Sequence, residues 1–95
     1  MALRIVKQDN VYFLKGRLHG NGAYGIRDFF KAVLSSDDHL TINLSDLDDL
    51  DLSAAMLLND LKIQGLMTNK TVSILHHSNE KIQGSFRQLG AQLVC

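Results

Sequence analysis

Short segments with a hydrophobic period of two alternate with longer segments of helical period along this chain. In residues 40–44 every second side chain is apolar, which predicts a strand with one buried face. In residues 26–34 the apolar side chains follow the spacing of one stripe of an amphipathic helix. The expected elements are strands near 3–5, 11–14, 40–44 and 72–75, helices over 24–34, 53–67 and 82–89, and a last short strand over 92–94.

The turns between these segments contain no proline, so glycine, asparagine and aspartate must mark them. Gln8-Asp9-Asn10 predicts a tight turn between the first two strands. The glycines of residues 16–25 predict a loop with unusual backbone angles, and Gly90 is expected to end the third helix. The aspartate-rich segment 46–51 is expected to be a solvated loop.

Strands that alternate with helices indicate a largely parallel sheet, because each crossover helix returns the chain in the same direction. The composition suits a globular domain, with 45% hydrophobic and 21% charged residues. A chain of 95 residues has room for little more than one layer of helices. We therefore expect a single α/β domain over residues 1–95, with a small, mostly parallel sheet and helices packed mainly on one face.

Charge and hydropathy argue against two classes of partner. Ten basic and ten acidic residues cancel, so no overall field favours nucleic acid. No segment resembles a signal peptide or approaches the roughly 18 apolar residues of a membrane span, so direct membrane insertion is not expected. The single cysteine, Cys95, allows no internal disulfide and suits a reducing compartment. We expect a cytoplasmic protein, and the sequence leaves its oligomeric state open.

Catalytic and metal-binding motifs are missing from the sequence. There is neither a phosphate-binding GxxxxGK[ST] loop nor a dinucleotide fingerprint after a strand. His76 and His77 are adjacent on a predicted strand, so their side chains should point to opposite faces. An EF-hand loop counted from Asp46 fails, since its sixth and twelfth positions are Asp51 and Leu57, not glycine and glutamate. We expect no enzyme activity, no metal and no cofactor.

The most informative segment is residues 41–58, TINLSDLDDLDLSAAMLL, which predicts a strand, an acidic loop and a helix that begins at Ser53. A serine at this position can accept hydrogen bonds from the unpaired N–H groups of the first turn. Negative charge is also favourable beside the positive end of the helix dipole. The residues alone therefore favour Ser53 as a helix N-cap over Ser53 as a modification site.

The same segment resembles the signature of STAS domains, the family named for sulfate transporters and anti-sigma factor antagonists, whose pattern is close to D-L-S-x-V-x-x-I-D-S-S-G-L. Asn43-Leu44-Ser45 matches its opening, Leu50-Asp51 matches the I-D pair, and Ser53 falls on the second serine. The resemblance continues over about ninety residues, through L-K-G-R-L at 14–18 and L-G at 89–90. In two departures from the pattern, Leu52 replaces the first serine and Ala54 replaces the glycine.

The resemblance implies a phosphorylatable interaction module. Ser53 corresponds to the serine that a partner kinase, often an anti-sigma factor, phosphorylates and that a PP2C-type serine phosphatase restores. Asp51 and Ala54 are then the residues that support the phosphorylation site. The expected function is partner switching of the anti-sigma factor antagonist type, in which the unphosphorylated domain binds the kinase and the phosphorylated domain releases it.

The expected partner-binding surface surrounds the phosphorylation site. Four aspartates lie within the six residues 46–51, and methionine is common at adaptable binding surfaces. The residues expected to contact the partner are Asp48, Asp49, Leu52, Met56 and Ile63. Three alternatives remain open: a STAS subunit of a lipid-transport ABC complex, a switching regulator of biofilm formation or secretion, and, least favoured, a small enzyme or nucleotide-binding domain.

Overall fold

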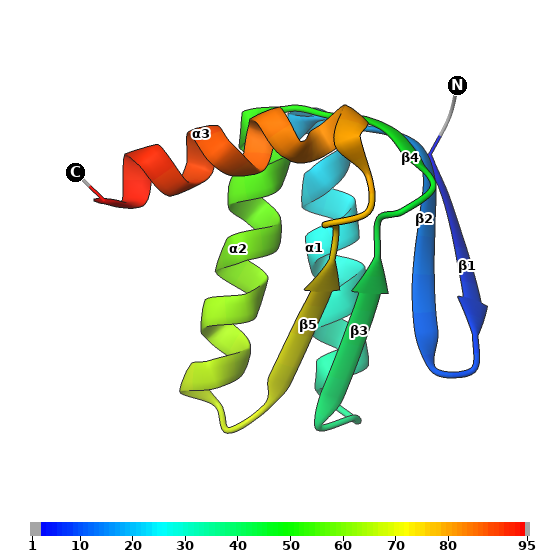
Figure 1. The fold of residues 1–95 in the computed structure, drawn as a ribbon. Helices are drawn as coiled ribbons and strands as arrows, with labels where there is room; N and C mark the ends of the chain where they lie inside the picture. The colour runs from blue at the N-terminus through cyan, green and yellow to red at the C-terminus, as the bar shows by residue number, and fades with distance from the viewer. Residues whose placement is uncertain (1–2, 95) are drawn as a thin grey trace.

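The computed structural model describes residues 3–94, with side chains described through Gly90 (Figure 1). An antiparallel hairpin opens the chain, and helices then alternate with parallel strands. The elements are β1 (Arg4–Gln8), β2 (Val11–Leu18), α1 (Gly20–Leu34), β3 (His39–Asn43), β4 (Leu47–Leu50), α2 (Leu52–Met67), β5 (Thr71–Leu75), the 3-10 turn η1 (Glu80–Ile82) and α3 (Gln83–Val94).

The sheet has the order β1-β2-β3-β5, and β4 pairs with the second half of β2. Only the β1–β2 pair is antiparallel, and its turn residues Asp9 and Asn10 have φ angles of 52° and 65°, as a tight hairpin requires. The helices α1 and α2 lie on one face of the sheet, and α3 runs across the end at which the parallel strands finish (Figure 1). The expected α/β class, with a mostly parallel sheet, is confirmed.

The core lies between the sheet and the helices α1 and α2. Every second residue of β2 from Tyr12 onward is buried, as one-sided covering of a strand predicts. Phe30 of α1 is completely buried, and its ring meets that of Tyr12 edge-on, with centroids 5.3 Å apart. Gly65 of α2 lies so close to β5 that an added Cβ would come within 2.8 Å of Val72 Cγ2.

The first helix begins four residues earlier than expected. The glycine-rich segment that predicted a loop is helical from Gly20 onward, and only Gly16, within β2, has a positive φ among the described glycines, at 101°. The loop prediction was wrong because burial of Ala23 and Ile26 against the sheet outweighs the low helix propensity of glycine. The chain therefore passes from β2 into α1 through one residue, His19.

The acidic segment is a strand and not the expected loop. β4 buries Leu47 and Leu50 and exposes Asp48 and Asp49 between them. Its parallel pairing with β2 places Arg17 opposite Asp49. The prediction was wrong because two adjacent aspartates interrupt the alternation of buried and exposed residues that marks a strand. The strand forms through its pairing with β2, which the local sequence does not reveal.

The end of the chain also differs from expectation. The helix α3 continues through Gly90 to Val94, so neither the predicted helix stop nor the short strand over 92–94 forms. Cys95 lies outside the described residues. Within residues 3–94, no helix combines the length and the apolar character that crossing a membrane requires.

Candidate functional site

Asp51, and not Ser53, caps the second helix. The backbone of Asp51 is extended, and its Oδ1 accepts a hydrogen bond of 2.8 Å from the Ala54 N–H. Ser53 therefore lies in the first turn of α2, with an exposed side chain. The sequence-based assignment of the N-cap was wrong because β4 ends at Leu50 and leaves Asp51 as the residue before the first helical turn.

The same carboxylate joins the starts of two helices. Asp51 Oδ2 accepts a hydrogen bond of 3.0 Å from the Gly20 N–H, the first amide of α1. A Cβ at position 20 would lie 3.1 Å from Ser53 Cβ and 3.7 Å from Ser53 Oγ. Glycine at this position therefore allows α1 to pass directly beside Ser53, and any larger residue would crowd the serine.

His19 completes this corner, and nothing in the sequence pattern singled it out. Its Nε2 lies 2.7 Å from Asp49 Oδ2, and about half of each side chain is exposed. The hydrogen bond from His19 holds the pKa of the Asp49 carboxyl below its ordinary value, and the N–H of Leu50 and the charge of Arg17 act in the same direction. The two side chains meet because β2 and β4 are paired in the sheet, although the residues are far apart in the sequence.

A shallow cavity of about 360 Å³ opens beside Ser53, between α1 and α2. Its wall combines the first residues of α1 with polar, apolar and acidic residues of α2. The lining residues are Gly20, Asn21, Tyr24, Ser53, Met56, Leu57 and Asp60. The Ser53 side chain therefore stands at the wall of a cavity that extends to the first turn of α1.

Four of the five predicted contact residues are exposed, and they form two groups. Asp48 and Asp49 are exposed on β4, and Asp48 also lies 3.4 Å from Lys81 Nζ. Met56 and Ile63 are 45% and 44% exposed on the outer side of α2. By contrast, Leu52 is half-buried against the core, and Ala54 is completely buried, so Ala54 supports the site only through packing and its capped N–H.

Two further exposed apolar residues continue the outer side of α2. Leu66 is 66% exposed and Met67 79% exposed. Exposed apolar side chains thus lie on the outer side of the helix, opposite the side that buries Leu58 and Leu61, and Asn59 and the exposed Asp60 separate Met56 from the other three. We define the outer apolar face as Met56, Ile63, Leu66 and Met67. A patch of this kind beside a polar site is typical of protein interfaces.

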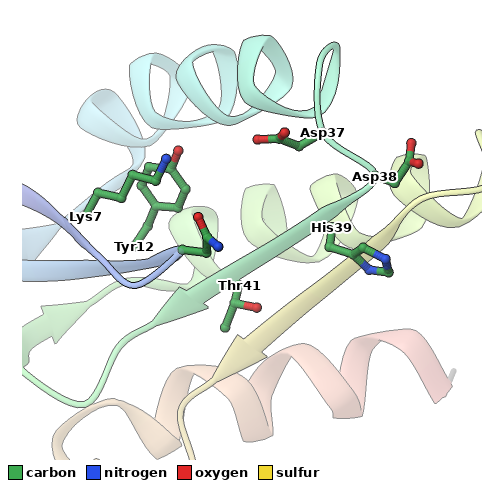
Figure 2. Close-up of a pocket in the computed structure, with 7 residues that line it drawn as sticks. Lys7, Tyr12, Asp37, Asp38, His39 and Thr41 are labelled. Atoms are coloured by element: carbon green, nitrogen blue, oxygen red, sulfur yellow. The ribbon is translucent and has the colours of Figure 1, made fainter.

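A second cavity, of about 260 Å³, lies at the other end of the sheet. Figure 2 shows Lys7 and Tyr12 on one side of it, with Asp38 and His39 on the other, and their polar groups do not converge on one point. Within the described part of the chain, no three His, Cys, Asp or Glu residues lie close enough to hold a metal ion. The cavity has no arrangement of groups that suggests catalysis.

His76 at the end of β5 stacks on Phe86 of α3, with ring centroids 3.9 Å apart and planes 7° apart. Its Nδ1 is buried and has no hydrogen-bond partner among the described residues. Burial lowers the pKa of His76 below its ordinary 6.5, and the neighbouring His77 and Lys62 add to this effect. The neutral ring is therefore the form that holds α3 against the rest of the domain.

This environment predicts a loss of stability in mild acid. The unfolded chain gains a proton on His76 near pH 6.5, whereas the folded protein gains it only at a lower pH. The stabilising contribution is complete above pH 6.5 and decreases as the pH falls from 6.5 through the folded pKa. Urea unfolding at several pH values should show a smaller acid loss for His76→Phe, which keeps the stacking. An equal loss in both proteins would contradict this assignment.

Comparison with known proteins gives a fold and no family. No family model matches this chain, and no curated protein matches it. Among solved structures, one described as "Crystal Structure Analysis of Mglu" superposes with a TM-score of 0.60 at 16% sequence identity. The match covers 75% of this chain and 18% of that chain, so this chain spans less than a fifth of that protein's length. At this identity the likeness establishes a shared fold alone.

Proposed function

We propose that this chain is a STAS-type partner-switching domain whose binding to a serine kinase of the anti-sigma factor type is controlled by phosphorylation of Ser53. The observation that carries the proposal is the exposed position of Ser53 in the first turn of α2, next to the start of α1 and above an exposed apolar helix face. The sequence resemblance and the α/β fold support the same function.

Phosphorylation at this position changes the charge of a surface that is already acidic. The γ-phosphoryl group of a nucleoside triphosphate is transferred to Ser53 Oγ, the hydroxyl proton leaves to a base, and the nucleoside diphosphate departs. The product carries about −1.5 to −2 additional charge. Asp48 and Asp49 are exposed on the neighbouring strand, so a partner docked there meets a concentrated negative patch.

The domain itself tolerates the new charge better than an interface does. Ser53 stands at the N-terminal end of α2, where the helix dipole favours an anion, as the Asp51 carboxylate that caps the Ala54 N–H illustrates. A partner that buries Ser53 would have to desolvate the phosphate and accept its repulsion. The switch therefore acts at the interface and requires no rearrangement of the core.

Affinity in the unphosphorylated state is assigned to the outer apolar face together with Asp48 and Asp49. Met56 lines the cavity beside Ser53, so the apolar face begins at the phosphorylation site. A partner that covers Met56 therefore also covers Ser53, which lines the same cavity. A PP2C-type phosphatase would restore binding, and a cytoplasmic location and the absence of an enzymatic activity accompany this proposal.

Affinity capture from the native cell lysate tests the switch. Wild type and Ser53→Ala should recover the same serine kinase, identified by mass spectrometry, and Ser53→Asp should lose it. Ser36→Asp is the matched control, because Ser36 is exposed after the far end of α1 and gains the same charge. Recovery of identical partners by all four proteins would reject the switch, and a lipid-transport ATPase among those partners would favour the STAS-subunit alternative.

A further inference from the structure

His19 has no role in the function proposed so far, although it directly precedes the glycine that packs beside Ser53. It is the N-cap residue of α1, yet its side chain makes no capping hydrogen bond and turns to Asp49 on β4. The residue after it, Gly20, is the one that approaches Ser53. An imidazole held by a surface carboxylate therefore lies one residue from the contact between α1 and Ser53.

We infer that His19 is the internal partner of a phosphate on Ser53, and that phosphorylation moves its ring from Asp49 to the phosphate. This inference rests on the proposed phosphorylation of Ser53. Adjacent Cα atoms are about 3.8 Å apart, and a Cβ on Gly20 would lie 3.1 Å from Ser53 Cβ. Through these two distances the His19 backbone lies near enough to Ser53 that the movement we propose is a rotation of the His19 side chain, with both helices kept in place.

The phosphate is the stronger of the two competing acceptors. It carries about −1.5 to −2 charge and three acceptor oxygens, whereas Asp49 offers a single carboxylate. Both His19 and Asp49 are about half exposed, so solvent weakens their present bond and eases the exchange. The first turn of α1 contains no acidic residue of its own, but the Asp51 carboxylate already accepts a hydrogen bond from its first N–H, so the attraction for the phosphate is assigned to His19 and not to the helix dipole.

The charged groups around His19 are arranged for such an exchange. Asp49 faces it from β4, and Arg17 of β2 is the register partner of Asp49. Asp51 binds the Gly20 N–H beside it. When His19 leaves, Arg17 remains to balance Asp49, so the exchange leaves no isolated carboxylate. His19 thus stabilises the phosphorylated, released state from within the domain.

The titration of the phosphate itself tests this role. Protein with phosphoserine installed at position 53 by genetic encoding is titrated by ³¹P NMR, which reports the second pKa of the phosphate, ordinarily about 6. A nearby imidazolium favours the dianion, so the wild-type phosphate should have a pKa roughly 0.5 to 1 unit lower than that of His19→Gln. Asp49→Asn frees the ring and should lower this pKa further.

His39→Gln is the matched control, because His39 is an exposed histidine at the opposite end of the parallel strands (Figure 2). It should titrate like wild type. Equal phosphate pKa values in wild type and His19→Gln would overturn the inference, as would an equal shift in His39→Gln. Because the phosphate is installed without a kinase, this result is independent of the lysate capture, and a failure of the switch remains distinguishable from a failure of His19.

Discussion

Asn79→Ala is expected to lower the free energy of unfolding by about 3 kcal/mol, because it removes the side-chain donor from two buried carbonyl groups, of which Leu44 O keeps a 3.2 Å bond from the Leu47 N–H. Asn79 is buried, and its Nδ2 donates hydrogen bonds of 2.7 Å to both Leu44 O and Leu47 O. Its Oδ1 also accepts a bond of 3.1 Å from the Lys81 N–H at the start of η1. One side chain thus ties the segment after β5 to both ends of the β3–β4 connection.

Urea unfolding followed by circular dichroism measures this loss. Gln88→Ala is the control, since Gln88 is exposed on α3 and its truncation should change stability by less than about 0.5 kcal/mol. Asn79→Asp keeps the volume but cannot donate, so it should be at least as damaging as alanine. A loss below about 1 kcal/mol for Asn79→Ala would show that the carbonyls find water instead.

The alternation of strand and helix periods predicted most of the fold, because it depends on which side chains are buried. The end of the chain was predicted wrongly as a helix stop and a strand, whereas the other two failures, β4 and the start of α1, depend on tertiary contacts. β4 contains two adjacent aspartates, so its sequence has no strand period, and it exists because β2 offers a free edge beyond β3. The glycines at the start of α1 similarly predict a loop when they are considered by sequence alone. In the fold, Gly20 lies so close to Ser53 that a larger residue would not fit, and this packing accounts for a glycine within the helix.

In the candidate site, too, the local sequence predicted some features, and others depend on contacts between distant segments. The position of Ser53 at the beginning of a helix follows from the sequence, since serine and aspartate mark such starts. The choice of Asp51 as the cap and its second bond to Gly20 depend on the meeting of two helix starts at one edge of the sheet. His19 was not predicted because its partner, Asp49, is thirty residues away and is brought near only by the β2–β4 pairing.

The outer apolar face of α2 is expected to contribute strongly to binding of the partner. Ile63→Glu is expected to weaken binding of the recovered kinase about thirtyfold, which corresponds to the ~2 kcal/mol typical of a central interface residue. Ile63 is 44% exposed and lies on the opposite side of the helix from Leu58 and Leu61, which are buried. The substitution should therefore change binding while the stability of the domain stays nearly constant.

The neighbouring residue supplies the control for this experiment. Gln64 is exposed on the same helix but lines a different cavity, one turned toward Lys31 and Ser35 of the first helix and its cap. Gln64→Glu adds the same charge one position away and should leave the dissociation constant within about twofold of wild type. If both variants weaken binding equally, the effect is a general repulsion of acidic charge. If only Ile63→Glu does so, the partner is in direct contact with the outer apolar face, and phosphorylation of Ser53 beside Met56 is then expected to weaken that contact.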